Sequence, residues 1–151
     1  MNLFLDSNAL IKLYHDEVGS DSLQRFIGKK DRDLVLTIAD ISKLEFTSAI
    51  LKRVRQGEIS LKIAKDIHSF FENDLYLFNI VSVGDEVKLL AGDLLLKVAH
   101  RKALGTLDSL QLSTAFVAHR VLPIDWFITS DKPLLNIARE YFPVFNPEVP
   151  D

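Results

Sequence analysis

Short apolar runs alternate along the chain with longer stretches of helical periodicity. Five of these runs predict buried strands, the last of them very short: Asn2–Leu5, Leu34–Thr37, Leu77–Val83, Trp126–Thr129 and Val144–Phe145. All are short enough for strands of ordinary length. The hydrophobic pattern therefore predicts four strands and a possible fifth near the end of the sequence.

Helical patterns occupy the stretches between these strands. We expect one helix after the first strand, running to about Tyr14, followed by Asp21–Ile27, Ser42–Gln56, Ser60 to about Asp74, Asp85–Lys102, Thr106 to about His119, and Pro133–Tyr141. Gly28, Gly57 and Gly105 mark helix ends. The regular alternation indicates an α/β protein and not separate helical and sheet regions.

The stretch Ser42–Gln56 carries the strongest helical pattern. Leu44, Ser48, Leu51 and Val54 share one face of it. Only a short turn separates this helix from the next, which predicts that the two lie antiparallel.

Strands separated by helices predict a Rossmann-like parallel sheet flanked by helices on both faces. Its connections should be right-handed. Residues 1–151 fit one domain of ordinary size. Ligands of such open sheets bind beyond the carboxyl ends of the strands, so that rim is where we look for function.

Composition narrows the chemistry. The sequence has no Cys, so disulfides and thiolate metal sites are excluded and any metal must be held by oxygen or imidazole. No secretory signal and no apolar run long enough for a membrane helix are visible. We expect a soluble, cytoplasmic protein with no membrane partner.

The charge balance argues only weakly against nucleic-acid binding. The net charge is −3, whereas nucleic-acid-binding domains usually carry a basic surplus. If four acids were neutralised by bound metal, the remainder of the chain would carry +1. A basic rim around an acidic pocket therefore remains compatible with this composition.

Four acidic residues fall at predicted strand ends or in first helical turns. Asp6 directly follows the first strand, and Asp131 comes two residues after Trp126–Thr129. Glu45 and Asp108 each lie in the first turn of a predicted helix. Carboxylates placed in this way could converge at one edge of the sheet.

Convergence would have a chemical consequence. Several like charges within a few ångströms do not all stay ionised unaided, and a divalent cation relieves their repulsion. Oxygen ligands without Cys or clustered His favour Mg²⁺ or Mn²⁺ over Zn²⁺. Such ions orient and activate water for phosphate chemistry.

Each acid also has a structural explanation. Glu45 completes a capping box that begins at Ser42. Asp108 suits a helix N-terminus, and Asp131 could cap the helix that contains Pro133. Asp6 is harder to explain structurally, because an acid that closes a buried strand is costly there unless it is used.

Four segments that contain these acids resemble the motifs of PIN domains, especially the VapC-type toxins of toxin–antitoxin pairs. The segments are Asn2–Tyr14 (NLFLDSNALIKLY), Ser42–Ala49 (SKLEFTSA), Leu107–Ala115 (LDSLQLSTA) and Phe127–Leu135 (FITSDKPLL). They match in order and spacing across nearly the whole chain, which makes the resemblance more specific than a single motif would.

The resemblance implies a PIN-like fold and cleavage of RNA that depends on Mg²⁺ or Mn²⁺, leaving a 5′-phosphate and a 3′-hydroxyl. It implies a homodimer and an antitoxin partner. By the same likeness Asp6, Glu45, Asp108 and Asp131 are the catalytic, metal-binding acids. Thr129 matches the family's hydroxyl residue near the fourth acid, and Asn8 matches a small polar position that braces the Asp6 loop.

Binding of an RNA substrate also requires cationic side chains that contact its phosphates. The candidates, several of which flank the motifs, are Lys12, Lys43, Arg53, Arg55 and Lys132. Most of them could equally be solvated helix residues. The four histidines share no spacing with the acids, and we expect ordinary surface or helix-end roles for them.

Two other classes of protein stay open at this point. A phosphoaspartyl protein also places an Asp after the first strand, but haloacid-dehalogenase-like phosphatases need a second Asp where this chain has Asn8. Receiver domains also use a strand-end Asp with a later Lys-Pro, here Lys132-Pro133, although their acids come in a different order. The third possibility is a PIN-like RNA-binding domain without activity, which the presence of all four acids disfavours.

Overall fold

Five parallel strands form one sheet in the computed structural model, which describes residues 1–28 and 33–149. The sheet has the order β3-β2-β1-β4-β5, and every neighbouring pair is parallel. The strands are β1 (Asn2–Leu5), β2 (Val35–Ala39), β3 (Phe78–Val81), β4 (Trp126–Ile128) and β5 (Val144–Phe145). The predicted α/β class and the short last strand are therefore confirmed.

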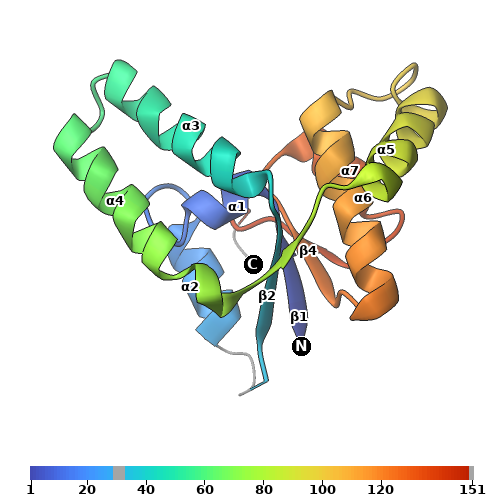
Figure 1. Ribbon diagram of the computed structural model, residues 1–151, viewed down its shortest axis with the longest axis horizontal. Helices are drawn as coiled ribbons and strands as arrows, with labels where there is room; N and C mark the ends of the chain where they lie inside the picture. Colours follow the sequence, from blue (N-terminus) through green and yellow to red (C-terminus); the bar gives the residue numbers. More distant parts are fainter. Residues whose placement is uncertain (29–32, 150–151) are drawn as a thin grey trace.

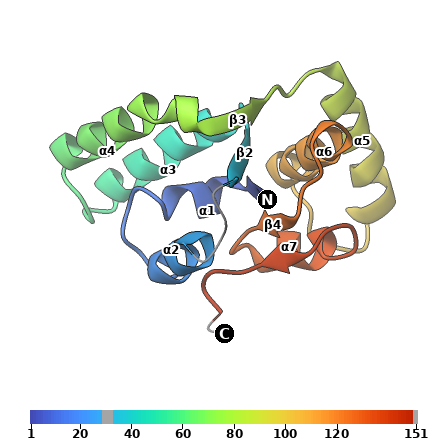
Figure 2. The same cartoon turned by 90° about the horizontal axis from the view of Figure 1, so that it is seen from below.

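Helices cover both faces of this sheet. They are α1 (Ser7–Ile11), α2 (Ser20–Gly28), α3 (Ser42–Arg55), α4 (Leu61–Asn73), α5 (Asp85–Val98), α6 (Thr106–Val121) and α7 (Lys132–Ala138), with a 3₁₀ turn at Leu75–Leu77. Figure 1 shows α3 and α4 side by side as one arm of the molecule and α5 with α6 as the other, the strands lying between them. Figure 2 shows α1 to α4 on one side of the sheet and α5 to α7 on the other.

Alternating side chains of β1 pack into two separate hydrophobic cores. Leu3 and Leu5 pack into the cluster beneath α1 to α4, whereas Phe4 points into the cluster beneath α5 to α7. The central strand is buried on both faces, as a parallel strand covered by helices should be. This burial explains why its sequence reads as a continuous apolar run.

The buried face of α3 is not the face that carries Leu44, Ser48 and Leu51. Phe46 and Ile50 are buried, and the ring of Phe46 lies 4.2 Å from that of Phe71 on α4. Leu44 is 75% exposed. The aromatic side chain of Phe46 faces the core, and the face that contains Leu44 lies toward solvent.

Two predicted helices end earlier than the sequence pattern indicates. The first helix stops at Ile11, and Leu13 and Tyr14 form turns instead. α5 stops at Val98, and residues 99 to 105 form the connection to α6. Ser60 caps α4 as predicted, because its hydroxyl accepts from the Ile63 N–H at 3.2 Å.

The strand order reverses at the centre of the sheet. The chain moves outward from β1 through β2 to β3, and then returns to place β4 on the other side of β1. A crevice at such a reversal, beyond the carboxyl ends of the strands, is the usual ligand site of an open α/β sheet. Among the described residues, no helix is long and apolar enough to span a membrane.

Candidate active site

Asp6 lies at this reversal point, directly after β1. One carboxylate oxygen accepts from the Ala9 N–H at 2.9 Å and caps α1, and the other accepts from the Thr129 hydroxyl at 2.5 Å. The side chain is almost completely buried. The pKa of Asp6 is raised to about 7, mainly because burial disfavours the charged form. These hydrogen bonds lower the pKa, and the charges of Asp108 and Glu45 raise it.

The loop after β4 is tied to the loop after β1. Thr129 Oγ1 accepts from the Asp131 N–H at 3.0 Å, and Asn8 Oδ1 accepts from the Ser130 N–H at 2.9 Å. Asp131 caps α7 through a 2.8 Å hydrogen bond from the Leu134 N–H. The capping role suggested by the sequence is thus present, but it uses only one of the two Asp131 oxygens.

Glu45 does not form the capping box that the sequence suggests. The cap position of α3 is Ile41, and no side chain caps the helix. Glu45 Oε2 instead accepts from the hydroxyl of Ser7 and from the Gln111 amide, the latter at 2.6 Å. The Glu45 carboxylate therefore points toward α1 and α6 and does not bond to the backbone at the start of α3.

Asp108 completes the group from the first turn of α6. Burial raises the pKa of Asp108, with the charges of Asp131 and Glu45 acting in the same direction and a backbone hydrogen bond from Gly105 opposing them. Asp6, Glu45 and Asp108 line one open cavity of about 210 Å³ together with Ser7, Asn8 and Gln111. Asp131 does not line this cavity, but it lies near enough to influence Asp108.

These carboxylates do not form a complete set of metal ligands. In the described part of the chain, no three acidic or His side chains lie close enough together to hold a metal ion. Their chemistry nevertheless fits a hard divalent cation. The donors are carboxylate oxygens, and the pKa of two of them is raised by burial and mutual repulsion, which a cation would relieve. One oxygen each of Asp6 and Asp131 is already engaged in capping a helix.

A comparison with protein families identifies the fold. The model of the PIN domain matches residues 3–140, which is nearly the whole chain. The chain belongs to the PIN domain family. Members of this family are in general nucleases. No curated protein matches the chain.

Solved structures of PIN domains support the fold at low identity. VapBC2 from Rickettsia felis, bound to a DNA fragment from its promoter, is 15% identical with a TM-score of 0.70, covering 97% of this chain and 98% of that one. VapC20 from Mycobacterium tuberculosis, a sarcin–ricin loop cleaving toxin, is 14% identical with a TM-score of 0.67 and 99% coverage of both chains. A toxin–antitoxin complex from Klebsiella pneumoniae is 18% identical with a TM-score of 0.61, covering 96% and 97%.

Two of the cationic side chains that were expected to contact RNA form ion pairs within this PIN domain instead. Lys12 is only 3% exposed and its ammonium group lies 2.8 Å from carboxylate oxygens of both Glu17 and Glu148. Arg53 is mostly buried and pairs with Glu17. Because a buried cation needs a counter-charge, both side chains are held by the fold, and we withdraw them as RNA contacts.

A second open cavity adjoins the acidic one along α3. Its volume is about 450 Å³, and it shares Glu45 and Ala49 with the acidic cavity. Arg55, which the sequence suggested, and Lys52, which it did not, line this groove beside the exposed side chains of Leu44 and Leu107. Lys43 is partly buried and Lys132 is exposed, and neither lines the groove.

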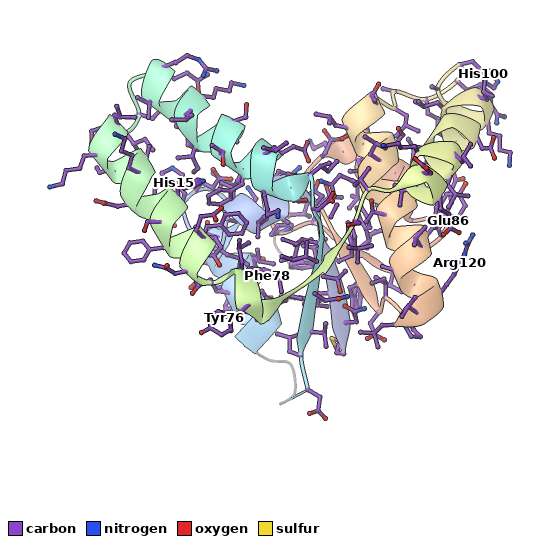
Figure 3. The ribbon with its side chains drawn as sticks, viewed as in Figure 1. His15, Tyr76, Phe78, Glu86, His100 and Arg120 are labelled. Atoms are coloured by element: carbon purple, nitrogen blue, oxygen red, sulfur yellow. The ribbon has the colours of Figure 1, made fainter. Side chains whose placement is uncertain are left out.

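The sequence interpretation also missed Ser7, Ser42 and Gln111. Gln111 follows Asp108 by three residues on a helix, so the two side chains share a face, which is the signal that could have identified it. The histidines lie elsewhere: Figure 3 shows His100 at the outer end of α5, and His119 accepts from the Ile124 N–H.

Proposed function

We propose that this PIN domain is a divalent-metal-dependent endoribonuclease and the toxin of a toxin–antitoxin pair. The observation that carries the proposal is Asp6, a buried carboxylate with a raised pKa that faces Asp108 and Glu45 at the central reversal of the sheet. A buried acid with a perturbed pKa in a cavity is a common property of catalytic sites.

In this proposal Asp6, Asp108 and Asp131 hold Mg²⁺ or Mn²⁺, with Glu45 assisting. A bound ion of this kind supplies a polarised water and charge stabilisation for in-line attack on a phosphodiester. The chain's own contribution is placement. Thr129 and Asn8 fix the two loops that carry Asp6 and Asp131, and both are proposed to support the site in this way.

RNA is the proposed substrate, and the groove along α3 supports it. Lys52 and Arg55 are exposed and lie beside the acidic cavity, so phosphates that flank the cleaved bond could be neutralised there. Leu44 and Leu107 offer apolar surface in the same groove, which suits unstacked bases of a single strand. Lys43 and Lys132, which lie close to Glu45 and Asp131 in the sequence, remain candidates. Products with a 5′-phosphate and a 3′-hydroxyl belong to the same proposal.

A protein antitoxin and a homodimer are part of the proposal. The fold resembles that of a protein in a toxin–antitoxin complex. Apolar side chains on α4 are also left exposed, and residues of both α3 and α4 line an apolar cavity of about 260 Å³, which fits a protein partner. Coexpression with the product of a neighbouring short reading frame should yield a complex with suppressed cleavage.

Membership of the PIN family favours a nuclease over a phosphoaspartyl protein. The inactive alternative is disfavoured because all four acids are present and three of them share one cavity. Incubation with beryllofluoride separates the phosphoaspartyl alternative, since a nuclease should form no adduct. Titration with Mn²⁺ separates the inactive one, since a decayed site should not bind the ion.

The decisive experiment is Asp6→Asn, which keeps the shape and removes one metal-binding charge. RNA cleavage in Mn²⁺ should be present in the wild type, absent with chelator and absent in the variant. Asp93→Asn, at an exposed position on α5, is the matched control and should cleave normally. Undiminished cleavage by Asp6→Asn would refute the proposal.

A further inference from the structure

Gln111 connects three helices at the edge of the acidic cavity. Its amide nitrogen lies 2.9 Å from the Ser7 hydroxyl on α1, 2.9 Å from the Ser42 hydroxyl on α3, and 2.6 Å from Glu45 Oε2. The side chain is only 2% exposed. A single amide group therefore lies where the helices that carry Glu45, Asp108 and the Asp6 cap come together.

Two donors converge on the same oxygen of Glu45. The Ser7 hydroxyl donates to Glu45 Oε2, and the Gln111 amide donates to it as well. Among the described residues, Oε1 of Glu45 has no protein donor. The carboxylate is thus fixed through one oxygen, and the other oxygen remains available in a cavity shared with Asp6 and Asp108.

The orientation of the Gln111 amide depends on this carboxylate. If its nitrogen and oxygen were exchanged, the oxygen would lie 2.6 Å from Glu45 Oε2 and repel it. In the observed orientation Gln111 Oε1 is buried without a hydrogen-bond partner. A buried oxygen without a donor is costly, and at Gln111 this cost accompanies an N–H that is donated to Glu45 Oε2.

We propose that Ser7 and Gln111 are positioning residues that hold Glu45 Oε2, so that Glu45 Oε1 is presented to the divalent ion. This inference rests on the proposed function, because it assigns a task within the same site. Groups that hydrogen-bond to metal-binding carboxylates and fix their orientation typically change metal affinity by about 10–100-fold when removed.

The test is calorimetric titration of the RNA-free protein with Mn²⁺. Gln111→Leu and Ser7→Ala should each weaken Mn²⁺ binding by about 10-fold or more. Ser7→Thr keeps the hydroxyl and should bind within about threefold of the wild type. The matched control is Ser113→Ala, which removes a buried hydroxyl of α6 that has no hydrogen-bond partner, and it should bind as the wild type does.

The midpoint of Mn²⁺ activation in RNA cleavage should move in parallel with the calorimetric affinity, with the maximal rate at saturating Mn²⁺ less affected. Wild-type Mn²⁺ affinity in folded Gln111→Leu and Ser7→Ala would overturn the inference. If Gln111→Leu does not fold, Ser7→Ala and Ser7→Thr decide the matter alone.

The two proposals fail in different ways. If the wild type binds Mn²⁺ and Asp6→Asn does not, but Ser7→Ala and Gln111→Leu bind normally, only the positioning role falls. If the wild type itself does not bind Mn²⁺, the metal-dependent function falls and the positioning role falls with it.

Discussion

Asp6 and Thr129 are 123 positions apart in the sequence, and the Thr129 hydroxyl donates a 2.5 Å hydrogen bond to the Asp6 carboxylate. The same hydroxyl oxygen accepts from the N–H of Asp131. One side chain thereby connects the acid after β1 with the loop that carries the acid after β4. The contact fixes the relative position of two proposed metal ligands.

Thr129→Val tests this connection. The variant removes a hydrogen bond that lowers the pKa of Asp6 and leaves the Asp131 N–H unpaired. We expect a loss of about 1–3 kcal/mol in unfolding free energy and weaker Mn²⁺ binding. The acidic limb of the pH–rate profile should also move to higher pH.

The control is Thr114→Val, because the Thr114 hydroxyl is buried but bonds only to a carbonyl of its own helix. It should leave Mn²⁺ binding and the pH profile unchanged. An unshifted profile in Thr129→Val, with normal Mn²⁺ affinity, would contradict a role for this hydroxyl at the site.

Asp6→Asn should stabilise the metal-free protein at high pH. The pKa of Asp6 is raised in the folded state. Between pH 3.8 and about 7, Asp6 therefore ionises in the unfolded chain but stays protonated in the folded one, so the free energy of unfolding falls as the pH rises. The resulting cost is complete above pH 7 and reaches about 4 kcal/mol as an upper limit, at about 1.4 kcal/mol per pKa unit. Asn carries no such cost and still caps a helix.

Thermal unfolding in chelator should therefore give a higher Tm for Asp6→Asn at pH 8 and a similar Tm at pH 4. Added Mn²⁺ should stabilise the wild type and not the variant. A lower Tm for the variant at pH 8 in chelator would mean that the Asp6 charge is not destabilising.

Lys12 should matter for stability and not for RNA. Burial alone would raise the pKa of Glu17, but hydrogen bonds and charges from Lys12 and Arg53 lower it below its usual range. A lowered folded pKa contributes stability above the unfolded pKa of about 4.5, and this contribution is lost as the pH falls through the folded value.

Lys12→Met should lower the Tm at pH 7 and flatten its fall between pH 5 and 3, because part of the stabilisation of ionised Glu17 is removed. RNA affinity of the folded variant should keep its dependence on salt. A reduced salt slope would instead return Lys12 to the set of phosphate contacts.

Lys52→Gln and Arg55→Gln test the groove along α3. Each phosphate contact on a single strand contributes about 0.7 to the slope of log affinity against log salt, so each variant should reduce the slope by about that amount. Lys88→Gln, at an exposed position on α5, serves as control. An inactive Asp6→Asn background allows binding to be measured without cleavage. Unchanged slopes would remove both residues from the proposed path.

The sheet and its central rim could be predicted from the sequence, because buried parallel strands read as apolar runs and their carboxyl ends share one edge. Helix ends were less predictable. α1 and α5 stop before their patterns do, since side-chain periodicity continues through a turn. Which face of α3 is buried could not be predicted from its own pattern, because Phe46 is buried against Phe71 on another helix while Leu44 stays exposed.

The orientation of Glu45 could not be read from local sequence. The spacing from Ser42 to Glu45 satisfies a capping box, yet partners on α1 and α6 offer the carboxylate two donors instead. The pairing of Lys12 with Glu148 also joins distant positions. In both cases the observed partner is far away in the sequence, and the local spacing of residues does not predict such contacts.

The place of β4 beside the central strand β1 has a consequence for synthesis of the chain. β4 pairs with β1, but it is made after β2 and β3, so the β1 edge stays unpaired until residues 126–128 have left the ribosome. Asp131 and Thr129 arrive at the same moment. A nascent chain that stops before β4 carries Asp6, Glu45 and Asp108 but neither of these residues, so the proposed nuclease site is assembled only after β4 and the loop that follows it have been made.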